Sequence, residues 1–498
     1  MKQIAACVIL AAAAALCPAG AEPSIVIDPA VRSEPFSGRV YVALVGGEGR
    51  PRQQMLDWFR PAMVFSKDVT DLKPGQALQV DDTWLSFPKG WADLDPGQYS
   101  AQAVVRCSPD SPEPGRGEGD LYSEVTTITV TGDGEPPAEP PALVTSRKVA
   151  ERPFRETDRV KLFEMVSPAL TRFNGEETKV RAGVVLPENF KDDGSRRYPI
   201  IYSVTGFGGD HRAAASMRQY VPPAAAEHVI LVVPDPKCYR GHSVFADSAN
   251  NGPWGEMLVN ELAPAIEEKY HAAGIDQRYV TGVSSGGWSS LWLQVTYPDQ
   301  FAGCWSHCPD PVDFRDFQRI NLYEPGANMY RDEKGNRRPI ARQGDEVILW
   351  YDDFCRREWA LGPGGQIHSF EAVFSRRGPD GSPELLFDRE TGAVDPEVAR
   401  SWEPYDIRLV LERNWKELGP RLAGKLHVYA GEKDTFYLEG SSALLKESLE
   451  KLGSDAVVQI APGMPHTLIP EGHKDMFETI LARAGVESQD AAAGAEAR

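Results

Sequence analysis

The chain is poor in cysteine and in basic residues, and beyond its first residues it has no long apolar run. Lysine and arginine number 53 against 72 acidic residues, which gives a net charge of −19. A surface this acidic repels phosphate backbones and anionic lipid, so we expect no nucleic-acid partner and no membrane insertion. Five of the seven cysteines lie beyond residue 21 and cannot all pair, so at least one thiol stays free. The pair in "CWSHC", Cys304 and Cys308, matches no zinc pattern and allows at most one disulfide.

The one long apolar run lies at the N-terminus, in "MKQIAACVILAAAAALCPAGA". It combines a positive charge at Lys2, an apolar stretch from 4 to 16, and small residues at Ala19 and Ala21 that suit a signal peptidase. The stretch is shorter than the roughly 20 residues that a bilayer core requires. We therefore predict that residues 1–21 are an export signal cleaved near Ala21 and that the mature protein is periplasmic or secreted.

Two apolar patterns divide the rest of the chain. Residues 22–130 contain short alternating runs such as "RVYVALV" and "SEVTTITV", separated by turn residues, and this period of two predicts an antiparallel β-sandwich domain. The stretch 131–144, "TGDGEPPAEPPALV", has the proline and acidic content of a semi-rigid linker. Residues 145–486 form the second domain, and 487–498 are predicted to be a disordered tail.

The second domain carries continuous apolar runs that alternate with amphipathic segments. Runs such as "YPIIYSV", "HVILVVP" and "KLHVYAG" are typical of strands buried on both faces, so we predict an α/β fold with a doubly wound, mostly parallel sheet. The alternation fails between 309 and 404, and so long a stretch between two strands predicts an excursion over the rim of the sheet. It is either a substrate-facing lid or structural filling.

The stretch "YVTGVSSGGWSS" raises the question of which of two adjacent serines is reactive. The pattern G-x-S-x-G fits Gly282 to Gly286 around Ser284, with a strand before it and a helix after it. Such a turn strains the nucleophile and brings two backbones together at positions −2 and +2, where only small residues fit. Centring the pattern on Ser285 would put Val283 at −2, so we predict Ser284 as the nucleophile and the backbone N–H of Ser285 as an oxyanion donor.

A serine nucleophile needs a base, and the base needs a carboxylate to orient it. In this topology both follow the serine, acid before histidine, each just after a later strand. Asp434 in "AGEKD" and His466 in "PGMPH" stand in that order, with Glu432 as the rival acid. The loop "VTGFGG" supplies a second oxyanion donor, which we assign to the amide of Phe207, with that of Gly208 as the rival. No cofactor and no metal are required.

Substrate-binding residues are expected in two places, on topology alone. One is the loop after the strand 228–234, and the other is the helix after the elbow. The candidates are Tyr239, His242, Asn250, Trp254 and Trp288.

With these motifs in place, the chain from about Lys179 onward resembles the α/β-hydrolase superfamily, above all its putative-esterase branch of esterase D, feruloyl esterases, enterobactin esterases and mycolyltransferases. The motifs "VTGFGG", "RYVTGVSSGGWSSLWLQVTYPDQFAG", "AGEKD" and "PGMPH" carry the resemblance. It implies Ser284 as nucleophile, His466 as base, Asp434 as its orienter, and Ser285 with Phe207 as oxyanion donors. The chain departs from many members at Thr205, where they carry histidine, and in the length of 309–404.

The sequence therefore predicts an exported serine carboxylic-ester hydrolase that acts through an acyl-enzyme on a small or carbohydrate-linked ester. Two alternatives stay open. One is a peptidase of the prolyl-oligopeptidase type, although about 110 residues before the second domain are too few for the usual propeller. The other is a non-catalytic polysaccharide-binding protein in which tryptophans of the β-domain, such as Trp84 and Trp91, stack on sugars.

Overall fold

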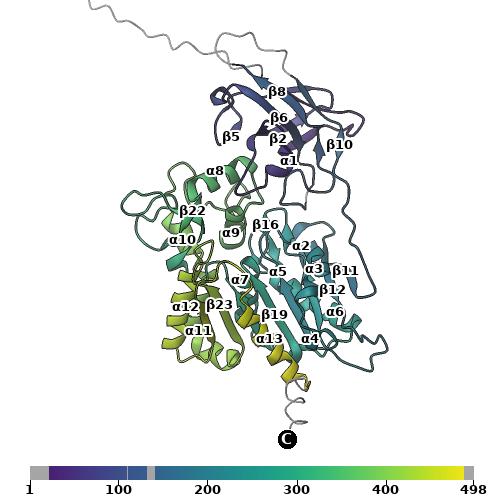
Figure 1. The fold of residues 1–498 in the computed structure, drawn as a ribbon, viewed down its shortest axis with the longest axis vertical. Helices are drawn as coiled ribbons and strands as arrows, with labels where there is room; N and C mark the ends of the chain where they lie inside the picture. Colours follow the sequence, from purple (N-terminus) through teal and green to yellow (C-terminus); the bar gives the residue numbers. More distant parts are fainter. Residues whose placement is uncertain (1–21, 109, 132–140, 487–498) are drawn as a thin grey trace, which may run out of the picture. The chain divides into compact units, whose positions relative to one another are not determined.

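The computed structural model describes residues 22–108, 110–131 and 141–486 (Figure 1). The predicted export signal, residues 132–140 of the predicted linker and the predicted tail lie outside these ranges. The chain divides into two compact units, one of Met1–Arg106 with Leu121–Lys148 and the other of Cys107–Asp120 with Val149–Arg498. None of the helices in the described ranges combines the length and the hydrophobicity needed to span a bilayer.

The first unit is built from β-strands, as alternating apolar residues predict. A three-stranded sheet has the order β4-β1-β9, and a seven-stranded sheet has the order β10-β7-β6-β2-β3-β5 with β8 paired to β6. Every pair is antiparallel except β1 with β9. The strands are β1 (Ser24–Ile27), β2 (Phe36–Gly46), β3 (Met63–Leu72), β4 (Ala77–Gln79), β5 (Leu85–Phe87), β6 (Gly97–Val105), β7 (Leu121–Tyr122), β8 (Thr126–Val130), β9 (Ala142–Thr145) and β10 (Arg147–Lys148).

One segment within the predicted N-terminal domain groups with the second unit. This segment, described at 107–108 and 110–120, is tied to the second unit by an ion pair between Glu113 and Lys237 (Oε2 to Nζ, 2.8 Å). The backbone of Pro112 also lies against Gly364, where an added Cβ would come within 2.1 Å of the proline carbonyl oxygen. The sequence gives no sign of these contacts because they join residues more than a hundred positions apart.

The second unit contains an eight-stranded sheet of the order β11-β12-β14-β13-β19-β20-β23-β24. The pairs from β14 to β24 are parallel, and β11 and β12 add antiparallel pairs at one edge. The mostly parallel sheet predicted from continuous apolar runs is therefore present. Its strands are β11 (Val160–Val166), β12 (Lys179–Val185), β13 (Ile200–Val204), β14 (Ile230–Pro234), β19 (Arg278–Val283), β20 (Gly303–His307), β23 (Leu426–Gly431) and β24 (Val457–Ala461).

Helices cover both faces of this sheet, and neighbouring residues of β20 show it, because successive side chains of a strand point to opposite faces. The indole nitrogen of Trp305 donates to Asp475 (2.7 Å) of helix α13 (Pro470–Arg483). The hydroxyl of Ser306 donates to the carbonyl of Gly287 (2.7 Å) in helix α7 (Ser285–Thr296). Both faces of the strand are thus buried, which explains why it reads as a continuous apolar run.

The carboxyl ends of the central strands lie at one edge of the sheet. Val283, the last residue of β19, pairs with His307, which ends β20. His307 in turn pairs with Tyr429 of β23, and Gly431 at the end of β23 pairs with Ala461 at the end of β24. The loops that follow these four strands therefore begin side by side, and side chains in them can meet.

The excursion, residues 309–404, has secondary structure and a cluster of aromatic side chains. It contains the hairpin β21 (Pro339–Gln343) and β22 (Glu346–Trp350) and the helices α8 (Tyr351–Leu361), α9 (Gln366–Phe374) and α10 (Pro396–Ser401). Aromatic rings fill its interior, including Phe314, Phe317, Phe370, Phe374 and Trp402. Whether the excursion moves as a lid stays a prediction.

The five cysteines of the described ranges are free thiols, so the disulfide that the "CWSHC" stretch allowed is not formed. Cys304, Cys308 and Cys355 are buried, whereas Cys107 and Cys238 are half-buried.

Candidate active site

Ser284 stands at a strained turn between β19 and α7. Its backbone has φ 63° and ψ −127°, a region that costs a residue with a side chain about 1–3 kcal/mol. Backbone bonds hold the turn, since the N–H of Ser284 donates to the carbonyl of His307 (3.0 Å) and the carbonyl of Ser284 accepts from the N–H of Asp310 (3.2 Å) and that of Trp288 (2.9 Å). Strain of this kind persists only where the surrounding structure fixes it, as it does here.

The two glycines that flank the turn are required by close backbone contacts. A Cβ on Gly282 would come within 2.3 Å of the carbonyl oxygen of Gly286, and a Cβ on Gly286 would come within 2.0 Å of the carbonyl oxygen of Val204. Neither position admits a larger residue without moving backbone. This is the arrangement that the G-x-S-x-G pattern centred on Ser284 predicts.

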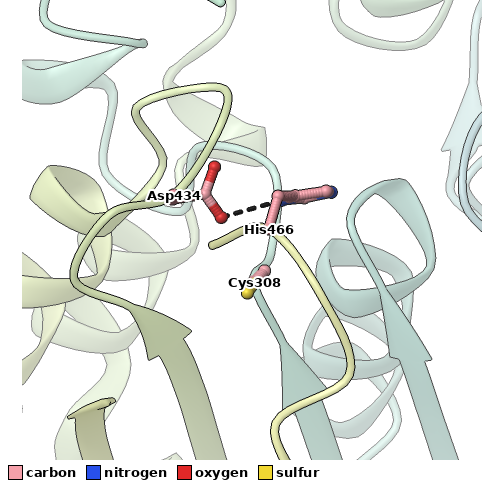
Figure 2. A group of neighbouring side chains, drawn as sticks. All are labelled: Cys308, Asp434 and His466. Carbon is pink, nitrogen blue, oxygen red and sulfur yellow. Dashed lines mark hydrogen bonds and ion pairs between the residues drawn. The ribbon is translucent and has the colours of Figure 1, made fainter. Parts of the chain in front are cut away.

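His466 and Asp434 are hydrogen-bonded to each other (Figure 2). The Nδ1 atom of His466 lies 2.7 Å from Oδ2 of Asp434, whose side chain is fully buried. The other carboxylate oxygen of Asp434 accepts the backbone N–H of Phe436 (2.8 Å). The rival acid, Glu432, accepts the backbone N–H of Gly463 instead (2.8 Å). Of the two acids that the sequence offered, the structure therefore pairs Asp434 with the histidine.

Two neighbours set the protonation of His466. Burial lowers its pKa, but the hydrogen bond and charge of Asp434 and the contact with Cys308 outweigh burial and hold the pKa of His466 above its ordinary value of 6.5. Cys308 follows β20, has φ 39°, and donates its thiol to the carbonyl of Thr467 (3.3 Å). A thiol therefore sits beside the histidine, in a position for which the sequence suggested no function.

A second buried carboxyl, that of Asp310, lies against both serines. Its Oδ1 accepts the hydroxyl of Ser284 at 3.4 Å, and its Oδ2 accepts the hydroxyl of Ser285 at 2.6 Å. Gln366, the first residue of α9, donates through Nε2 to the same Oδ2 (3.1 Å) and to Oγ of Ser285 (3.2 Å). Burial raises the pKa of Asp310 to about 6. The excursion thus supplies two residues to the surroundings of Ser284.

The excursion also supports the loop that carries Asp434. The guanidinium of Arg342, in β21, donates to the carbonyl of Asp434 (2.9 Å) and pairs with the carboxylate of Glu439 (2.7 Å). The N–H of Arg342 donates to the carbonyl of Thr435 (2.8 Å).

The sequence comparison with protein families decides what kind of protein this is. A family described as "Putative esterase" matches residues 174–438, which is more than half of the 498 residues. The chain belongs to the Putative esterase family. Its sheet has the strand order of an α/β-hydrolase, with the strained serine after β19 and the acid and histidine after β23 and β24.

Two curated relatives each match only part of this chain. Esterase Rv1288 of Mycobacterium tuberculosis is 31% identical over 144 residues, which are 27% of this chain and 30% of that protein. Dipeptidyl-peptidase 5 of Aspergillus oryzae is 26% identical over 126 residues, 24% of this chain and 17% of that one. The matches thus span less than a third of either relative.

Two solved structures are each similar to about two thirds of this chain. A ferulic acid esterase matches at 15% identity and a TM-score of 0.40, over 65% of this chain and 98% of its own. An S-formylglutathione hydrolase from Agrobacterium tumefaciens matches at 16% identity and a TM-score of 0.39, over 65% and 95%.

The glycine loop after β13 reaches Ser284 in this family member. A Cβ on Gly206 would lie 3.3 Å from Cβ of Ser284, so the predicted oxyanion donor Phe207 is the next residue along from a direct neighbour of the nucleophile. His242, predicted to bind substrate, supports this loop from behind: its Nδ1 accepts the N–H of Val244 (3.0 Å), and its Nε2 donates to the carbonyl of Thr205 (2.9 Å). Burial lowers the pKa of His242 to about 4, which keeps the ring neutral, and its two hydrogen bonds fix the tautomer.

The other predicted substrate residues lie in different surroundings. Trp288 and Trp254 are 1% and 7% exposed and pack against aromatic rings of the core. Asn250 is buried and donates to the carbonyl of Ser375 (2.9 Å). Tyr239 is 40% exposed. Substrate binding by these side chains stays a prediction.

One group of side chains in the described ranges has the composition of a metal site. Potential ligand atoms of Cys308, Asp434 and His466 all lie within 4.8 Å of one another. Two of these are the proposed base and its orienter, so an ion bound here would compete with catalysis rather than assist it.

Proposed function

We propose that this protein is an exported serine carboxylic-ester hydrolase that acts through an acyl-enzyme on a small or carbohydrate-linked ester. The observation that carries the proposal is the strained serine at the end of β19, at the same sheet edge as a hydrogen-bonded histidine–aspartate pair. Export rests on residues 1–21. We propose that the first unit is a β-sandwich domain; it differs from the predicted range 22–130 because 107–120 group with the second unit and β9 and β10 with the first.

The reaction divides into two transfers of the acyl group. Ser284 attacks the ester carbonyl while His466 takes the hydroxyl proton, and Asp434 holds Nδ1 of the ring and stabilises the imidazolium. The backbone N–H groups of Ser285 and Phe207 stabilise the oxyanion of the tetrahedral intermediate. His466 then gives its proton to the departing alcohol, and an acyl-enzyme remains. Water repeats the sequence, with His466 again as base, and releases the acid.

In this mechanism the hydroxyl of Ser284 turns from Asp310 toward His466. The 3.4 Å bond between the hydroxyl and Asp310 is long for an O–H···O hydrogen bond and is therefore weak. Rotation of the side chain loses little, and a bound ester that displaces the hydroxyl from Asp310 favours the reactive orientation.

Substitution of the nucleophile tests the proposal. Ser284→Ala should lower kcat for p-nitrophenyl acetate by about 10⁴- to 10⁶-fold and should abolish labelling by a fluorophosphonate probe. Ser216→Ala, at an exposed serine whose hydroxyl bonds only to the carbonyl of Ala213, is the matched control and should behave as wild type. Equal turnover and labelling by wild type and Ser284→Ala would refute the mechanism. A dipeptide p-nitroanilide, assayed on the same pair, addresses the peptidase alternative.

A further inference from the structure

Asp310 is a buried acid that the proposed mechanism does not use. Asp310 is 5% exposed, and its carboxyl lies within hydrogen-bond distance of both Ser284 and Ser285. Its backbone N–H donates to the carbonyl of Ser284 (3.2 Å), which holds the backbone of Asp310 beside that of the nucleophile. The position next to the reacting hydroxyl is therefore built into the fold.

The carboxyl of Asp310 lacks the lysine or arginine partner that a buried acid usually has in a protein, as far as the described ranges show. Within the described ranges Asp310 forms no ion pair with lysine or arginine, and the positive group that acts on it is the proposed base, His466. Its hydrogen-bond partners are two hydroxyls and an amide, which are neutral. Buried carboxylates are normally paired with a positive group because removing a charge from water is expensive. His466 is neutral when it acts as the base, so in the active form no positive group of the described ranges faces Asp310 until a ligand brings one.

The neighbouring Gln366 leaves a second acceptor unused. Its Nε2 is committed to Asp310 and Ser285, which fixes the orientation of the amide. Its Oε1 is buried and has no hydrogen-bond partner in the structure. An unsatisfied buried acceptor is unfavourable. An acceptor without a donor, Oε1 of Gln366, and a carboxyl without a lysine or arginine partner thus lie close to the nucleophile in the described ranges.

We propose that the site binds esters that carry an ammonium group close to the scissile carbonyl, with Asp310 and Gln366 as its recognition residues. An ammonium supplies several hydrogen-bond donors and the missing positive charge, whereas a hydroxyl supplies a single donor and no charge. The net charge of −19 draws cationic substrates toward the protein. The inference rests on the proposed function and names the substrate class of the same site.

The arrangement also discriminates against neutral esters. Asp310 accepts from the side chain of Ser285, whose backbone N–H is the proposed oxyanion donor. A carboxylate at this place repels the oxyanion that forms on a neutral ester. An ammonium bound between them cancels this repulsion, so the carboxylate helps one class of substrate and hinders the other.

Three ethyl esters that differ in one group test the proposal: glycine ethyl ester, ethyl glycolate and ethyl propionate. They present ammonium, hydroxyl and methyl at the same position and release the same ethanol, which is measured at a pH where the amine is protonated. Each kcat/KM ratio is divided by the corresponding ratio for hydroxide, which removes differences in intrinsic reactivity. Wild type should prefer the glycine ester to ethyl propionate.

Asp310→Asn, which keeps the shape and removes the charge, should reduce that preference by about 10- to 100-fold. Ethyl propionate should become faster, because the carboxylate no longer repels its oxyanion. Gln366→Met should reduce it less and serves as the second variant if Asp310→Asn does not fold. Asp299→Asn removes an exposed charge, paired with Arg421 (2.6 Å) on the surface, and should leave the preference unchanged. A general structural defect would instead lower all three rates together.

The outcomes separate this inference from the proposed function. If wild type hydrolyses the three esters equally and Asp310→Asn leaves the ratios unchanged, the substrate class is wrong while the hydrolase stands. A preference for ethyl glycolate that Asp310→Asn removes would overturn the ammonium in favour of a hydroxyl donor. If wild type neither turns over any ester nor labels with a fluorophosphonate, the proposed function itself fails.

Discussion

Asp434→Asn should lower the rate and also move its pH dependence. In the structure the carboxylate of Asp434 is fully buried and bonds to Nδ1 of His466 at 2.7 Å. That bond and its charge help to hold the pKa of His466 above 6.5. A base works only when unprotonated, so activity of wild type should rise with pH through this raised pKa, and the optimum should be alkaline.

The asparagine removes the charge and leaves burial, which lowers the pKa of His466. A charge-assisted hydrogen bond contributes about 1.5–3 kcal/mol, and one pH unit corresponds to about 1.4 kcal/mol. The acid limb of kcat/KM should therefore move down by about one to two pH units. The plateau should fall by about 10⁴-fold, because the amide no longer holds the ring in the reactive tautomer.

The value of kcat/KM for p-nitrophenyl acetate, measured from weakly acidic to alkaline pH, reports both effects. Glu432→Gln is the control, since this acid bonds to the backbone N–H of Gly463 and not to the histidine. A fall of the plateau with no movement of the acid limb would refute the electrostatic part of the reasoning. A large loss with Glu432→Gln and none with Asp434→Asn would reassign the acid.

Three further predictions follow from the packing around the site. Zinc or cadmium should inhibit ester hydrolysis where magnesium does not, because Cys308, His466 and Asp434 offer ligand atoms within 4.8 Å of one another. Cys308→Ser should weaken that inhibition in a dose–response assay. Equal inhibition of the variant and the wild type would exclude the thiol as a ligand. Gly286→Ala should destabilise the protein by about 3 kcal/mol or more in chemical denaturation, because its Cβ would meet the carbonyl oxygen of Val204 at 2.0 Å. The control is Gly46→Ala, because open space surrounds Gly46. Trp288→Ala should cost about 3–5 kcal/mol of unfolding free energy as a buried core residue, and a negligible change would show that the indole is not held by the core.

The elbow and the parallel strands are predictable from the sequence because their causes are local. Ser284 is identified by glycine at two fixed positions and by an apolar run before it, all within a dozen residues. The order of Asp434 and His466 follows from the topology, since parallel strands bring their carboxyl ends to one edge. Knowing where the strands end is therefore enough to predict that these side chains meet, although they lie far apart in the sequence.

The same rule, applied to β20, would have drawn attention to Asp310, which follows that strand as Asp434 follows β23. Its surroundings, "CPDPV", read as an ordinary proline turn, and nothing nearby suggests two serine partners. Gln366 carries no signal at all, because it reaches Asp310 from a helix 56 positions later, and contacts of that kind arise from packing. His242 was expected to bind substrate because of its loop, whereas its observed bonds depend on the path of the backbone around it.

The bonds from the excursion to the elbow limit how this protein can be re-engineered. Shortening 309–404 to widen access to the nucleophile would remove Gln366, which bonds to Ser285 and Asp310, and Arg342, which bonds to the acid loop. A truncated form would then lose the alignment of its reactive groups. Grafts from relatives with shorter connections should retain equivalents of both residues.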